Sequence, residues 1–190
     1  MIDETLLQSA IDYSAAEPST LSDAEFDKRM ASLKHRSPAE FDELKLLRDS
    51  TSGFKRSKHT HRMLSLDNAF TPGEASSFFT EVEELFIEPK VDGAALSLVY
   101  EKGKLVDAIT RGDGDVGDSV LENALMIPEV VKQADGLTGI VRGEVFIRKQ
   151  DFADINSELE RTGDVQFANT RNLAAGTLKS HDPSVVSERK

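Results

Sequence analysis

The chain has 190 residues, a formal charge of −11 and no cysteine. This length suits one domain, or a small domain joined to a larger one. Without cysteine, disulfides and any zinc site with cysteine ligands are excluded. Because phosphate repels an acidic surface, the charge argues against general coating of nucleic acid, but it still allows a local DNA contact.

The sequence also lacks membrane and export signals. No apolar run approaches the length of a membrane-spanning helix, and residues 1–4 do not have the basic start of a signal peptide. We therefore expect a cytoplasmic protein that makes no contact with a membrane.

Three helices are predicted at the N-terminus. The first covers residues 3–12, and the second, residues 22–34, opens with the capping box Ser-Asp-Ala-Glu. The third, residues 37–49, repeats this pattern with a proline at its first helical position. Together they predict a small helical unit over residues 1–50.

A basic stretch follows the helical unit. Residues 51–62 are polar and predict a linker, in which His59 and His61 are expected to be solvated. A third capping box at Thr71 opens a helix predicted to end at about Glu84.

The centre of the sequence is the stretch Glu-Pro-Lys-Val-Asp-Gly, residues 88–93. Apolar runs at residues 85–87 and 94–100 predict strands on either side of it. Lys90 would then lie on rigid backbone and be partly desolvated, and only a neutral amine is a nucleophile. Asp92, two residues on, could orient the amine or take its proton.

Two strands and a loop are expected next. Residues 94–100 and 105–110 flank a hairpin turn. Residues 111–117 form a loop with three glycines, and Asp118 is a suitable cap for a helix to Met126. The remaining predicted elements are a strand at 140–147 and helices at 149–162 and 169–179.

Several side chains in these elements have two readings. Arg111 can hold a phosphate or ribose, or belong to an ordinary hairpin loop. Asp113 and Asp115 can help to hold a metal ion or be solvated. Glu144, inside an apolar strand, indicates either a buried ion pair or a ligand pocket. Arg171, near a helix start with two asparagines, fits either phosphate binding or helix capping.

The order of four segments resembles one known family. Glu-x-Lys-x-Asp-Gly is followed by Thr-Arg-Gly-Asp-Gly-x-x-Gly, then Arg-Gly-Glu-Val-Phe, then Phe-Ala-Asn-x-Arg-Asn-x-Ala-Ala-Gly. This order resembles the adenylation domain of NAD-dependent DNA ligases, and the resemblance covers nearly the whole chain. It implies an α+β fold, in which the helical unit precedes a nucleotidyltransferase domain of the DNA ligase and capping enzyme type, ATP-grasp-like, with mainly antiparallel sheets over residues 63–190.

The resemblance implies a role for each matched residue. Lys90 would take AMP from NAD, with Mg²⁺ as a further cofactor, and Asp92 would support it. Glu88 would read the adenine amino group, with Ser65 and Leu66 along the base.

Other matched residues would contact the rest of the substrates. Arg111 and Glu144 would hold the ribose and phosphate region. Arg171 would contact nicked double-stranded DNA or the adenylate, and Lys179 is expected at the DNA, although it replaces a usual arginine and loses the bidentate geometry. No residue is assigned as a metal ligand.

The helical unit resembles the family's small domain for the nicotinamide mononucleotide half of NAD. The matched residues are Tyr13, Asp23, Phe26 and Asp27. The family commonly has histidine at Ser14 and tyrosine at Phe26, so this half of the cofactor would be held differently here.

Family members continue with further lysine strands, an oligonucleotide-binding barrel, a zinc finger and helix-hairpin-helix repeats. We therefore expect an adenylation domain that is incomplete at its C-terminus. Its remainder would lie on a second polypeptide or have been cut away, and without it nicks are not sealed. The alternative is a catalytically inactive NAD- or AMP-binding module. A third reading, an ATP-dependent DNA or RNA ligase, conflicts with Tyr13 and residues 23–27, which ATP users do not need.

Overall fold

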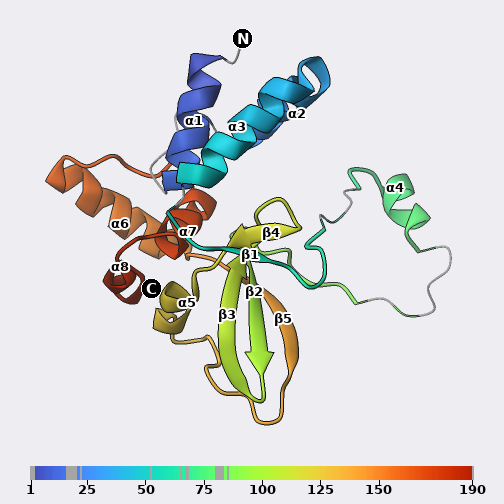
Figure 1. The fold of residues 1–190 in the computed structure, drawn as a ribbon, viewed down its shortest axis with the longest axis vertical. Helices are drawn as coiled ribbons and strands as arrows, with labels where there is room; N and C mark the ends of the chain where they lie inside the picture. The colour runs from blue at the N-terminus through green and yellow to red at the C-terminus, as the bar shows by residue number, and fades with distance from the viewer. Residues whose placement is uncertain are drawn as a thin grey trace.

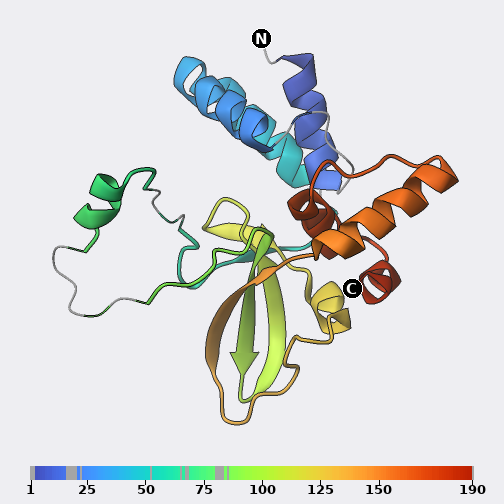
Figure 2. The same ribbon diagram turned by 180° about the vertical axis from the view of Figure 1, so that it is seen from behind.

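The computed structural model describes residues 3–15, 21, 23–51, 53–64, 66, 69–79, 84 and 86–189. Figures 1 and 2 show helices at one end of the molecule and an antiparallel sheet at the other. No helix among these residues is long and apolar enough to cross a bilayer. The mixture of helices and antiparallel sheet confirms the α+β class.

The three predicted N-terminal helices are confirmed, and each runs two or three residues past its predicted end. The second stops before Pro38, as expected where proline disfavours helical backbone in the preceding residue. Their facing apolar side chains form a core drawn entirely from this unit: Leu6, Ala10, Leu21, Phe26, Met30, Leu33 and Leu44. The helices are α1 (Glu4–Ala15), α2 (Asp23–Arg36) and α3 (Pro38–Thr51).

The expected linker is partly a strand, which corrects the prediction. Within residues 53–63, here named the basic strap, β1 (Arg56–Lys58) pairs antiparallel with β4 (Val116–Asp118). Further along the strap, the N–H of His59 donates to Asp115 O at 2.8 Å and that of Met63 to Gly114 O at 2.9 Å. Phe54 packs against the core of the sheet, and Met63 is buried. The strap is therefore held by apolar side chains near both of its ends, while the residues between them are polar.

The expectation of a solvated histidine is wrong for His59. Its side chain is buried, and Nε2 lies 3.0 Å from Thr110 O, where the ring N–H can donate to the carbonyl. His61, by contrast, is exposed as expected. Buried His59 thus lies between two exposed residues, Lys58 and Thr60.

The main sheet has the antiparallel order β3-β2-β5. The predicted hairpin between the first two strands is confirmed, and its turn residues Lys102 and Gly103 both have positive φ, at 49° and 84°. This backbone is the one that tight hairpin turns require. The strands are β2 (Ala94–Glu101), β3 (Lys104–Thr110) and β5 (Gly139–Val145).

Helices pack along one side of this sheet in both views. One apolar cluster joins Leu96 and Ala108 of the sheet to Val120, Ala124 and Leu178. Asp118 does not cap the next helix as predicted, since it belongs to β4 and the cap position is Val120. The helices are α5 (Leu121–Met126), α6 (Lys149–Thr162), α7 (Thr170–Leu178) and α8 (Pro183–Glu188).

The segment before β2 differs most from expectation. The capping box at Thr71 is confirmed, but α4 (Pro72–Ser77) ends well before Glu84 and lies away from the sheet (Figure 1). The strand expected at residues 85–87 is not seen at 86 and 87, whose side chains are 86% and 95% exposed. A strand needs a partner for its backbone groups, and none of the described residues pairs with this segment.

Candidate active site

Lys90 lies on an irregular loop, residues 86–93, that leads into β2 and is here named the lysine loop. Its side chain is exposed, as is that of Glu88. The loop ends at Gly93, which is buried against β5: a Cβ there would lie 2.1 Å from Val145 O. Only glycine fits this approach of two backbones, so the chain is held tightly three residues after the lysine.

Two side chains from distant segments reach this loop. The N–H of Gly93 donates to Glu144 Oε1 at 3.2 Å. Arg171 Nη1 lies 3.4 Å from Asp92 Oδ1, in an ion pair that is partly exposed on both sides. Asp92, Glu144 and Arg171 were each singled out from the sequence alone. In the structure Glu144 contacts Gly93 and Arg171 contacts Asp92, both within three residues of Lys90 in the sequence.

Arg171 is the second residue of α7, and this end of the helix is firmly built. Asn169 caps it by accepting the N–H of Asn172 at 2.7 Å. The next two residues, Leu173 and Ala174, are fully buried. The backbone of Arg171 is therefore anchored, and only its side chain extends to the lysine loop.

Arg111 begins the turn between β3 and β4. The carboxylate of Asp113 accepts the N–H groups of Asp115 and Val116 at 2.9 and 2.8 Å. Asp115 pairs with Arg62 at 2.9 Å. Both acids of the loop thus have partners within the protein, and the described residues include no group of three or more metal-binding side chains.

Lys179 lies in a buried ion pair that the sequence did not indicate. Its Nζ is 3.2 Å from one oxygen of Asp118, and Arg56 Nη1 is 2.9 Å from the other. Burial disfavours the carboxylate, but the charge of Lys179 and the hydrogen bond from Arg56 outweigh it, so the pKa of Asp118 lies below its usual value. The DNA contact of Lys179 stays a prediction. In this structure its ammonium group forms an ion pair with Asp118.

The residues predicted for the nicotinamide half lie in the helical unit. Tyr13 belongs to α1, and Asp23 and Asp27 belong to α2. Phe26 is 5% exposed within the core of that unit. Phenylalanine suits this position, because the hydroxyl of a tyrosine would need a hydrogen-bond partner in the core. Its stacking on a ligand stays a prediction.

Of the two residues predicted beside the adenine base, only one can be placed. Ser65 lies outside the described residues. Leu66 is 75% exposed, so its side chain is not packed against the rest of the domain.

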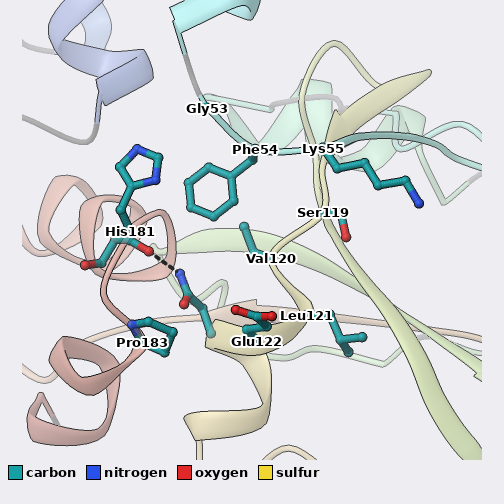
Figure 3. A pocket seen from close by; sticks show the side chains of 11 residues that line it. Gly53, Phe54, Lys55, Ser119, Val120, Leu121, Glu122, His181 and Pro183 are labelled. Atoms are coloured by element: carbon teal, nitrogen blue, oxygen red, sulfur yellow. Dashed lines mark hydrogen bonds between the residues drawn. The ribbon is translucent and has the colours of Figure 1, made fainter.

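One open cavity of about 410 Å³ lies apart from these residues (Figure 3). It is bordered by the start of the strap, the junction of β4 with α5 and the loop before α8. The rings of Phe54 and His181 stack there with centroids 4.9 Å apart. None of its lining residues is a predicted site residue, so the lysine loop remains the candidate active site.

The sequence was also compared with known proteins. Residues 51–190 match the family described as the NAD-dependent DNA ligase adenylation domain. The chain is 46% identical over 157 residues to "DNA ligase 1" of Opitutus terrae, covering 75% of this chain and 23% of that protein. It is 39% identical over 199 residues to "DNA ligase" of Cereibacter sphaeroides, covering 93% and 28%. A third relative, "DNA ligase" of Mycoplasma genitalium, is 40% identical over 150 residues. The chain thus spans about a quarter of the length of these relatives.

Proposed function

Because this chain belongs to the NAD-dependent DNA ligase adenylation domain family, we propose that it transfers AMP from NAD to Lys90. The observation that carries the proposal is the lysine loop, which two distant segments contact: Glu144 at Gly93 and Arg171 at Asp92. The whole protein would be a DNA ligase that acts on nicked double-stranded DNA.

The proposed step is a displacement at phosphorus. The lone pair of Lys90 Nζ attacks the α-phosphorus of the AMP half of NAD and forms a nitrogen–phosphorus bond. The bond from this phosphorus to the bridging oxygen breaks, and nicotinamide mononucleotide leaves with the electron pair. The amine loses a proton, for which Asp92 is placed two residues away, and the bound AMP then serves nick sealing.

The other roles follow the matched residues. We propose that adenine contacts Ser65, Leu66 and Glu88. The side chains of Leu66 and Glu88 are exposed. Arg111 and Glu144 are proposed to hold the ribose and phosphate. Tyr13, Asp23, Phe26 and Asp27 are proposed for the nicotinamide half, where carboxylates favour a positively charged ring and repel a triphosphate. Mg²⁺ is expected with the nucleotide, and no described residue is assigned to it.

The proposal extends to partners. DNA would approach Arg171 and Lys179, and a second polypeptide would carry the remaining part of the ligase. The relatives named DNA ligase, of which this chain covers 22% to 28%, support DNA as the substrate of the whole protein.

Intact-protein mass spectrometry tests the proposed step. After incubation with NAD and Mg²⁺, the chain should gain the mass of AMP, and peptide mapping should place it on Lys90. ATP should give far less adduct. Lys90→Ala should abolish the gain, whereas Lys149→Ala, an exposed lysine on α6, should retain it. An adduct on another lysine would contradict the assignment, and NAD binding without any adduct would favour the inactive binding module.

A further inference from the structure

The ion pair between Arg171 and Asp92 has features of a positioning contact. The two side chains are 42% and 69% exposed, and their nearest atoms are 3.4 Å apart. Exposed pairs of this kind contribute little to folding stability. The effect of this ion pair is therefore on the conformation of the loop that carries Asp92, and not on the stability of the whole fold.

That segment has few other restraints among the described residues. Residues 86–93 form no strand, so no ladder of backbone hydrogen bonds holds Lys90. Gly93 fixes the end of the loop through Glu144 and its close approach to Val145. The contact with Arg171 extends this anchoring to Asp92, two residues from the nucleophile.

The two ends of the contact also differ in rigidity. Arg171 extends from a capped helix whose following residues are buried, whereas Asp92 lies on an irregular loop. An arginine with an anchored backbone can thus locate a carboxylate on an irregular loop, and its planar fork does so more specifically than a lysine.

We infer that Arg171 is a positioning residue for the adenylation step, because it holds Asp92, and with it the Lys90 loop, against α7 before DNA is bound. This inference rests on the proposed adenylation of Lys90. It differs from the contact with DNA or the adenylate expected for Arg171, because a residue that holds the loop acts before either of them is bound. A residue that only contacts DNA has no effect on that step.

The first test measures adduct formation with NAD and Mg²⁺ but no DNA, at several NAD concentrations. Because small displacements of reacting groups are costly, Arg171→Gln should lower the maximal rate about tenfold or more, with the half-saturating NAD concentration changed less than about twofold. Arg171→Lys should recover part of the rate. The control is Arg161→Gln, which removes an exposed arginine paired with Glu158 on α6 and should behave as wild type. An unchanged maximal rate in Arg171→Gln would overturn the inference and leave the proposed function standing.

The second test does not depend on activity. Hydrogen exchange of a peptide covering residues 86–93 should be faster in Arg171→Gln than in Arg161→Gln, while exchange in α7 and the melting temperature stay unchanged. Asp92→Asn should give the same acceleration, and the double variant should add nothing further. If the wild-type chain forms no adduct, the proposed function fails, and exchange then decides only whether Arg171 holds the loop. Equal exchange of the loop in both arginine variants would show that Arg171 does not hold it.

Discussion

Asp118 and Asp115 both pair with basic residues far away in the sequence, and the burial of these pairs distinguishes their roles. The carboxylate of Asp118 is 6% exposed, between Lys179 at 14% and Arg56 at 27%. The pair of Asp115 with Arg62 is far more exposed, at 50% and 63%. Removing one partner of a buried pair leaves a charge without compensation, whereas an exposed pair is readily replaced by water.

Asp118→Asn should therefore destabilise the chain strongly. We expect the free energy of unfolding to fall by about 3 kcal/mol, because Lys179 and Arg56 would remain buried without a carboxylate. Urea unfolding at pH 7 measures this change. Asp115→Asn is the matched control and should cost less than about 1 kcal/mol. Equal losses in the two variants would contradict the structural role given to Asp118.

The same carboxylate predicts a pH dependence. Its pKa is lowered by folding, so its contribution is fully present above the unfolded pKa of about 3.9 and is lost as pH falls through the folded pKa. The difference in unfolding free energy between wild type and Asp118→Asn should thus be constant above about pH 5 and shrink below about pH 4. A difference that grows on acidification would show that the folded pKa is raised instead.

Among the elements, the basic strap shows how a polar segment becomes ordered. Its β1 pairs with β4, and its ends are fastened by Phe54 and Met63. Hydrogen bonds also join the strap to β3. Asp107 of β3 accepts hydrogen bonds from the hydroxyls of Ser57 in the strap and Ser119 after β4, at 2.9 and 2.6 Å. The strap is therefore bonded to both β3 and β4.

Hydrogen exchange distinguishes this arrangement from a linker. The amides of His59 and Met63 should exchange slowly, because both donate to the loop between β3 and β4. The amides of α4 should exchange fast, since this helix of 6 residues has no buried residue. Fast exchange throughout residues 56–63 would restore the linker interpretation.

At the scale of the whole molecule, the structure has separate apolar cores. The helical unit packs residues between Leu6 and Leu44 against one another. The sheet packs Leu96 and Ala108 against α5 and the end of α7. No residue belongs to both of these clusters. The two parts can therefore lose stability independently.

Leu33→Ala should unfold the helical unit selectively. This side chain is 1% exposed, and truncating a buried leucine typically costs about 2–5 kcal/mol. Helical circular dichroism should fall while exchange in β2 and β3 stays at the wild-type rate. Leu178→Ala, equally buried in the sheet core, is the matched control and should accelerate exchange in the strands instead. Loss of both parts in either variant would indicate a single cooperative unit.

The sequence by itself determined the features that depend on near neighbours. The capping boxes at Ser22, Ser37 and Thr71 each begin a helix within a residue or two of the predicted start. The hairpin at Lys102 was equally evident. Helix caps and tight turns are stabilised by hydrogen bonds between residues two to four apart, so their signals are contained in a short stretch. The candidate active site was identified differently, because the order of four short motifs resembles one family.

Only the tertiary structure decided the pairings over long distances. Arg56 meets Asp118 across 62 residues and Arg171 meets Asp92 across 79. Nothing local distinguishes Asp118 as the centre of an ion pair from Asp118 as a helix cap. The apolar run before Lys90 resembles a strand, yet a strand forms only where a partner supplies its hydrogen bonds. Such partners are chosen by the packing of the whole domain, which no short stretch of sequence encodes.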